Sequence, residues 1–272
     1  MKVIDFHLHL SQKPDLNEEL RILDYDIRSL LIQLSIKLKK AKIDKGMVFL
    51  LDTRVLTKEQ DLETMKKLIN SHNLSNLFFS VMLDFRRKDV YDILDRAASC
   101  GVNGVKFHPI HQKILPQDYE RIKELAILAD SKGLMIVIDT HYVGYDCDVY
   151  SGLRLAKFIL PSIKGPVVLA HSGGLKVLEA VVLALDYKNV YLDISFSIPF
   201  WAGSSIEKDF AFAIKKVGSG RCIYGSDTPF IDLNFAKEFT EKFLMNYGFS
   251  PQEKENIFYN TANDLLEKRS IK

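Results

Sequence analysis

The stretch Val3-Ile4-Asp5-Phe6-His7-Leu8-His9 combines a β-strand with two histidines at its end. Its first part, Val3–Phe6, is nearly continuous in apolar residues and does not alternate with polar ones. Strands that are buried on both faces of a parallel sheet have this pattern, whereas strands with one solvated face alternate. The segment therefore predicts a parallel strand with His7 and His9 at its C-terminal end.

Seven more runs of the same kind follow along the chain. They are Met47–Leu51, Leu77–Leu83, Gly104–Phe107, Leu134–Asp139, Pro166–Ala170, Val190–Ile194 and Cys222–Tyr224. Successive runs begin about 24 to 44 residues apart, which leaves room for a helix in each connection. Amphipathic segments occupy these connections, at 27–42, 57–69, 88–99, 117–132, 174–186, 205–217 and 234–247, with a weaker one at 150–160.

Eight such strand–helix units predict one closed (β/α)₈ TIM barrel. The amino-acid composition does not change along the chain, so we expect a single domain over residues 1–272. Two further segments, 251–258 and 260–268, predict C-terminal helices that cap the barrel. A doubly wound open sheet is the alternative. It would need an unusual number of strands, and no Gly-rich phosphate loop follows the first strand.

The composition excludes several classes of protein. Of the 272 residues, 47% are hydrophobic and 26% charged, and the net charge of +2 does not drive the chain toward nucleic acid or an anionic membrane. No apolar run approaches the ~20 residues of a membrane span, and the first residues show no apolar h-region of the kind that a signal peptide has. Three cysteines without metal-site spacing suit a reducing compartment. We expect a cytoplasmic protein with a small-molecule substrate, and homo-oligomerisation remains open.

Histidines gather at the ends of the predicted strands. Five of the seven lie at or just after such an end, namely His7, His9, His108, His141 and His171. Chance would place about one there, and the C-terminal ends of barrel strands all open onto the face that carries the chemistry. Alternate residues of a strand point the same way, so His7 and His9 can both aim at one point. Neutral imidazoles are good ligands for zinc and similar cations.

An aspartate follows the eighth predicted strand. Asp227 lies in Tyr224-Gly225-Ser226-Asp227-Thr228-Pro229, where it is flanked by turn residues. Such an aspartate can cap a helix or a turn. It can also bind a cation and accept a proton from water that the cation has acidified.

The chain resembles the amidohydrolase superfamily, specifically the amidohydrolase-related branch, which also holds metal-dependent decarboxylases of the aminocarboxymuconate-semialdehyde type. The resemblance spans residue 5 to about 266. It rests on six motifs: Asp5-Phe6-His7-Leu8-His9, Gly104-Val105-Lys106-Phe107-His108-Pro109, Asp139-Thr140-His141, Leu169-Ala170-His171-Ser172-Gly173-Gly174, Gly225-Ser226-Asp227-Thr228-Pro229 and Asn260-Thr261-Ala262-Asn263.

The resemblance implies a role for each matching residue. His7, His9 and His141 match ligands of the metal, and Asp227 matches the aspartate that touches both metal and water. His171 matches a histidine that orients water or substrate in one-metal members and binds the second ion in two-metal members. Lys106 matches a lysine that is carbamylated and bridges the two ions in two-metal relatives. One divalent transition metal, most simply Zn²⁺, is favoured, and two ions are the alternative.

Other residues are expected at the substrate. Lys106 and His108 follow the fourth strand and can face the cavity, and Arg54 and Arg86 follow the second and third strands. These cations suggest an anionic substrate. Trp201 can wall an apolar pocket, Asp193 either binds substrate or satisfies local backbone, and His111 is expected to have no role.

Two reactions suit this set of residues. The first is hydrolysis of a small amide, lactam, lactone or ester, with Asp227 and His171 as catalytic residues and water as the nucleophile. The alternative is a lyase, a decarboxylase of a small unsaturated or aromatic carboxylic acid, in which Asp227 or His171 delivers a proton to carbon. The ligand set does not separate the two.

Overall fold

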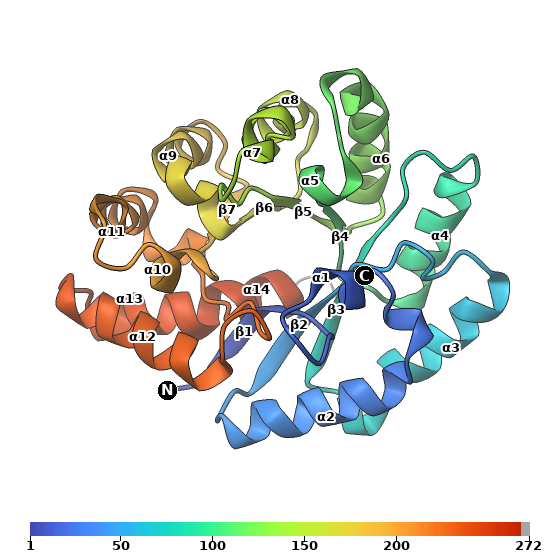
Figure 1. The fold of residues 1–272 in the computed structure, drawn as a ribbon, viewed down its shortest axis with the longest axis horizontal. Helices are drawn as coiled ribbons and strands as arrows, with labels where there is room; N and C mark the ends of the chain where they lie inside the picture. Colours follow the sequence, from blue (N-terminus) through green and yellow to red (C-terminus); the bar gives the residue numbers. More distant parts are fainter. Residues whose placement is uncertain (268–272) are drawn as a thin grey trace.

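Eight parallel strands pair in sequence order, β1 to β8, in the computed structural model, which describes residues 1–267. Figure 1 shows the helices arranged around this sheet. The strands are β1 (Ile4–Leu8), β2 (Lys45–Leu50), β3 (Leu77–Met82), β4 (Gly104–Phe107), β5 (Met135–Asp139), β6 (Val167–Ala170), β7 (Val190–Asp193) and β8 (Cys222–Ile223). Each predicted strand is found with its ends within two residues. The predicted (β/α)₈ barrel is confirmed.

Helices of the outer ring follow the strands. They are α2 (Ile27–Lys40), α3 (Glu59–Ile69), α4 (Val90–Cys100), α6 (Tyr119–Ser131), α8 (Gly152–Ile159), α9 (Val177–Asp186), α11 (Ser205–Val217) and α12 (Leu233–Asn246). Shorter helices lie in the connections or at the C-terminus: α1 (Leu16–Glu19), α5 (Pro109–Gln112), α7 (Asp146–Val149), α10 (Ser197–Phe200), α13 (Pro251–Glu255) and α14 (Thr261–Glu267). No helix of the described residues is long and apolar enough to cross a membrane.

Hydrogen bonds between β1 and the segment after β8 close the barrel. The amide of Phe6 donates to the carbonyl of Tyr224 at 3.0 Å, and the amide of Asp227 donates to the carbonyl of His7 at 2.9 Å. Gly225 lies at this seam, where an added Cβ would be 2.7 Å from the Cβ of His7. Only glycine allows the two chains to approach this closely.

An irregularity in β1 decides where the histidines point. Ile4 and Phe6 belong to the apolar cluster inside the barrel, so strict alternation would turn Leu8 inward as well. The register between β1 and β2 shifts between Asp5 and Leu8, and Leu8 packs with the outer cluster under the helices. His7 and His9 therefore point into the barrel mouth.

The C-terminal helix α14 closes the opposite end of the barrel. Its residues Ala262, Leu265 and Leu266 pack with the interior residues Ile4 and Phe6. The helix contacts both β1 and β8. This arrangement is the C-terminal cap predicted from the sequence. Residues 268–272, which the predicted helix 260–268 and the predicted domain 1–272 include, lie outside the described part of the chain.

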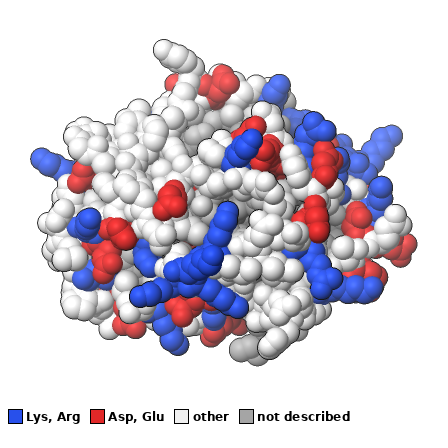
Figure 2. Space-filling model, turned by 60° about the horizontal axis from the view of Figure 1, so that its bottom comes forward, with Lys and Arg blue, Asp and Glu red and all other residues white. Residues whose placement is uncertain are grey.

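Charges of both signs are mixed on the surface. Figure 2 shows Lys and Arg interspersed with Asp and Glu over the face that it presents, with one small basic cluster near the centre. The last turn of α2 carries Lys37, Lys39 and Lys40, where cations are favoured by the helix dipole. No single sign of charge covers this face.

A substitution at Gly152 tests how tightly the first turn of α8 packs against the end of β5. A Cβ at this position would lie 1.9 Å from the carbonyl oxygen of Asp139. We expect Gly152→Ala to lower the free energy of unfolding by about 1–3 kcal/mol, because backbone must move to admit the methyl group. Gly220→Ala is the control, since its Cβ would meet nothing within 4 Å. Urea unfolding measures both, and equal stability of the two variants would contradict this packing.

Candidate metal centre

A cavity of about 260 Å³ opens at the C-terminal ends of the strands. Its polar lining comprises His9, Lys106, His108, His111, Asp139, His141, His171 and Asp227. Its apolar lining comprises Leu51, Ile110, Val143, Phe196 and Phe230. Ionisable groups and an apolar wall thus face one small space, as in many ligand sites.

His7 is held in one orientation by an acid behind it. Its Nδ1 lies 2.6 Å from Asp193 Oδ2 and 3.0 Å from Ser195 Oγ, which leaves Nε2 to face Asp227 Oδ1 at 3.4 Å. Burial, reinforced by the charge of Lys106, holds the pKa of His7 well below its usual value. The imidazole is therefore neutral and presents a lone pair at Nε2.

His9 also lies near a buried acid, but without a hydrogen bond to it. Its Nε2 lies 3.1 Å from Asp227 Oδ1, and its Nδ1 lies 3.6 Å from Glu19 Oε2. Burial lowers the pKa of His9, but the carboxylates of Asp227 and Glu19 outweigh this and raise it. Glu19 is fully buried and also accepts a hydrogen bond from the amide of Ser11.

His171, which directly follows β6, completes a first group of potential metal ligands, which consists of His7, His9, His171 and Asp227. One ligand atom each of His7, His171 and Asp227 lies within 4.8 Å of the others. The ring of His171 stacks on that of His7 at a centroid distance of 4.7 Å. Burial lowers the pKa of His171, but Asp139 and Asp227 outweigh it and raise the pKa to about 9.

Two residues of this group have strained backbones. His171 and Asp227 have φ values of 63° and 64°, which non-glycine residues rarely adopt. Such strain is concentrated at functional sites, where surrounding structure holds it in place. The strain here accompanies the placement of both side chains at the cavity.

A second group surrounds the buried Lys106. It consists of His108, Asp139 and His141, whose ligand atoms also lie within 4.8 Å of one another. Lys106 Nζ lies 3.2 Å from Asp139 Oδ2 and 3.1 Å from His7 Nε2, so it links the two groups. Burial raises the pKa of Asp139, but His108, Lys106 and His141 outweigh it and hold the pKa well below its usual value.

His141 lines the same cavity as His9, His171 and Asp227, but it lies closest to the second group. Its Nδ1 bonds to Asp139 Oδ1, and it belongs to the second group, without His7 or Asp227. Asp139, the last residue of β5, faces Lys106 instead. The strand-5 position nearest the first group is thus occupied by a carboxylate.

Two residues expected at the substrate lie elsewhere. Arg54 pairs with Asp52 at 2.7 Å and with Asp24 at 2.9 Å, and it does not line the cavity. Trp201 does not line the cavity either and packs against Phe200 and the outer core. The aromatic residues of the cavity wall are Phe196 and Phe230.

Some residues that line the cavity, or that support the side chains in it, were not predicted from the sequence. His111, expected to have no role, lines the cavity with its ring 3.8 Å from that of His108. Arg86, which was expected near the substrate, does not line the cavity and instead donates hydrogen bonds to the carbonyl oxygens of Gln112 and Lys113. Asp139 is the last residue of a predicted strand, and this position alone could have marked it as a residue of the cavity. Glu19 lies in the long connection after β1, where no pattern marked it.

The donor atoms of the first group fit a divalent cation. Both strand-1 imidazoles turn Nε2 to one oxygen of Asp227. The Nδ1 of His7 is hydrogen-bonded to the buried Asp193, whereas the Nδ1 of His9 lies 3.6 Å from the buried Glu19, too far for a hydrogen bond. Metal-ligating histidines typically have such a carboxylate behind them, because it fixes the tautomer and the ring orientation. His7, His9, His171 and Asp227 would hold the ion.

The family model described as amidohydrolase matches residues 4–268. The chain belongs to the amidohydrolase family. A comparison with curated protein sequences finds no significant match.

Solved structures share the fold. An uncharacterised TIM-barrel protein from Bordetella bronchiseptica has a TM-score of 0.71 at 18% identity, covering 99% of this chain and 100% of that one. A putative 2-pyrone-4,6-dicarboxylic acid hydrolase from Pseudomonas putida has a TM-score of 0.66 at 18% identity, with 98% and 97% covered. A dihydroxybenzoic acid decarboxylase from Polaromonas, with bound manganese, has a TM-score of 0.68 at 13% identity, with 98% and 97% covered.

Glu19→Gln tests the support of His9. The amide keeps the shape of the side chain but removes the charge that orients the imidazole, so metal affinity should fall by about 10–100-fold. Glu18→Gln is the matched control, because the Glu18 carboxylate accepts an exposed hydrogen bond from the amide of Gln12 and does not line the cavity. Competition with a chromophoric chelator measures both. Unchanged affinity in Glu19→Gln would show that Glu19 does not support the metal centre.

Proposed function

We propose that this protein is a metal-dependent hydrolase that acts on a small amide, lactam, lactone or ester. The observation that carries the proposal is the convergence of His7 Nε2 and His9 Nε2 on Asp227 Oδ1, at 3.4 and 3.1 Å. An open cavity next to such a group leaves room for water and a substrate carbonyl. Family membership is consistent with an enzyme of this kind.

We propose one ion, held by His7, His9, His171 and Asp227, with zinc as the first choice. Three imidazoles and one carboxylate suit zinc better than magnesium or calcium, which prefer oxygen ligands. This set differs from the sequence expectation in using His171 in place of His141. The second group, His108, Asp139 and His141, makes two ions the alternative, which metal stoichiometry decides.

Asp227 has the central acid–base role. A bound divalent cation supplies Lewis acidity, which polarises a carbonyl and acidifies water. Asp227 accepts the proton of the attacking water and returns it to the leaving group. His171 lines the same cavity and serves as a ligand of the proposed ion.

Lys106 and His108 are proposed to bind the substrate. Both are buried and line the cavity, whereas Arg54 and Arg86 are occupied elsewhere. The preference for an anionic substrate therefore rests on Lys106, whose charge Asp139 partly balances. The apolar wall and a volume of about 260 Å³ favour a small substrate with an apolar or aromatic body.

A decarboxylase is the second candidate. The observation that favours it is His171, which faces the cavity and has a pKa raised to about 9 by Asp139 and Asp227. In this second candidate His171 is not a ligand of the ion and delivers a proton to carbon. The metal-reconstituted protein should be offered a panel of aromatic lactones and amides and a panel of aromatic carboxylic acids. Ring opening or amide cleavage without CO₂ release supports the hydrolase, and CO₂ release supports the decarboxylase.

Asp227→Asn tests the chemistry. The imidazoles still hold the ion, but the amide cannot exchange a proton, so activity should fall by on the order of 10³ or more while most metal is retained. Rates with the substrate found in the panel and elemental analysis measure the two effects. Activity within tenfold of the wild-type rate would refute the role of Asp227.

A further inference from the structure

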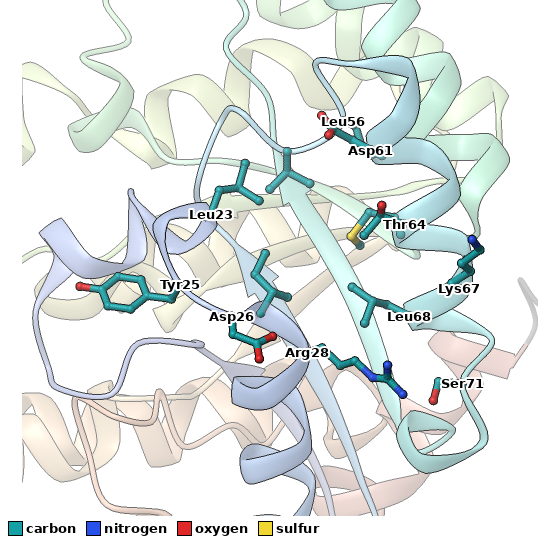
Figure 3. Close-up of a pocket in the computed structure, with 13 residues that line it drawn as sticks. Leu23, Tyr25, Asp26, Arg28, Leu56, Asp61, Thr64, Lys67, Leu68 and Ser71 are labelled. Atoms are coloured by element: carbon teal, nitrogen blue, oxygen red, sulfur yellow. The ribbon is translucent and has the colours of Figure 1, made fainter.

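A second cavity lies outside the barrel mouth, in a groove between α2 and α3 (Figure 3). Its volume is about 500 Å³, against about 260 Å³ at the metal centre, and the two cavities share no lining residue. Its apolar lining comprises Leu23, Ile27, Val55, Leu56, Met65 and Leu68. A cavity of this size and character suits a small ligand.

The wall of this groove is preformed. Leu56 has a φ of 66°, in the left-handed region, and its carbonyl oxygen accepts a hydrogen bond from Arg96 Nε at 2.8 Å. On the other side, the amide of Leu23 donates to Asp52 Oδ2 at 3.1 Å. The buried carboxylate of Asp52 therefore ties together the two connections that form the groove.

The acids of the groove already have partners. Asp26 caps α2 by accepting a hydrogen bond from the amide of Ser29 at 3.2 Å. Asp61 accepts a hydrogen bond from the amide of Lys58 at 2.9 Å, at the start of α3. Both carboxylates stabilise helix N-termini, which accounts for their presence.

Arg28 is exposed and lines the groove without such a partner. Within residues 1–267, no hydrogen bond or ion pair of its guanidinium is found. It is the second residue of α2, and the N-terminal end of a helix disfavours a cation. Figure 3 shows its side chain extending toward Ser71, which follows α3. Lys67 of α3 also lines the groove. Two cations and a hydroxyl thus accompany its apolar lining.

We propose that this groove binds a small amphipathic carboxylate. The carboxylate pairs with Arg28, which can bind it through two parallel hydrogen bonds, and Ser71 donates a further one. The apolar body lies against Leu56, Met65 and Leu68. A chain on the order of ten carbon atoms fits a cavity of this class. The proposal does not depend on the reaction at the metal centre.

Decanoate is the probe, and the methyl signal of Met65 in NMR spectra of the full-length protein is the readout. Met65 lines the groove, whereas Met135 lies in the barrel interior and serves as the internal control. Decanoate should shift the Met65 signal saturably and leave that of Met135 unchanged. Met65→Leu assigns the signal by removing it. Absence of a saturable shift at Met65 would overturn the proposal.

Recognition of the carboxylate charge is tested in two ways: by substituting Arg28, and by replacing decanoate with decanol. Arg28→Gln should weaken decanoate binding by about tenfold, because a charge-assisted pair is lost, and should leave decanol binding almost unchanged. Arg154→Gln, at an exposed position of α8, is the matched control and should bind decanoate like the wild type. If Arg28→Gln binds decanoate as tightly as the wild type, or decanol binds as tightly as decanoate, the groove does not select a carboxylate and the proposal is wrong.

Discussion

The seam between β1 and β8 is the constraint on which the site depends. Asp227 donates its amide to the carbonyl of His7, and His9 donates its amide to the carbonyl of Thr228, at 2.9 and 2.8 Å. These bonds close the barrel and also place the Asp227 carboxylate against both strand-1 imidazoles. Fold and metal centre therefore share one set of backbone contacts.

Buried acids behind the imidazoles then influence which ring nitrogen faces the cavity. Asp193 and Glu19 stand behind His7 and His9, and both are fully buried. A buried carboxylate is costly unless it is hydrogen-bonded or paired. Asp193 accepts hydrogen bonds from His7 and from the amide of Ser195, and Glu19 accepts one from the amide of Ser11. The orientation of His7 is thus fixed before any ion binds, which lowers the reorganisation that binding requires.

Much of the fold could be predicted because buried parallel strands have a distinct apolar pattern. The positions of His7, His9, His171 and Asp227 followed from the strand ends. The inward direction of His7 did not follow from alternation alone, since Phe6 also points inward and a shift in register separates them. Side chains in connections were the least predictable, because Glu19 and Arg54 depend on tertiary contacts that leave no periodic signal.

The fifth strand shows the same limit at the site itself. Asp139 and His141 are two residues apart, and the sequence alone does not tell which one faces the centre. The structure turns Asp139 toward Lys106 and leaves His141 bonded to Asp139 from the second group. Both side chains line the cavity, and their different neighbours depend on backbone geometry that the motif does not specify.

The most direct test of the account is the metal content of a His7→Ala/His9→Ala double variant beside that of the wild type. Both proteins are reconstituted with zinc and examined by elemental analysis, with circular dichroism to verify the fold. We predict about one equivalent in the wild type and below about 0.2 in the variant, with the barrel still folded. Full occupancy in the folded variant, or no metal in the wild type, would contradict the assignment of this centre.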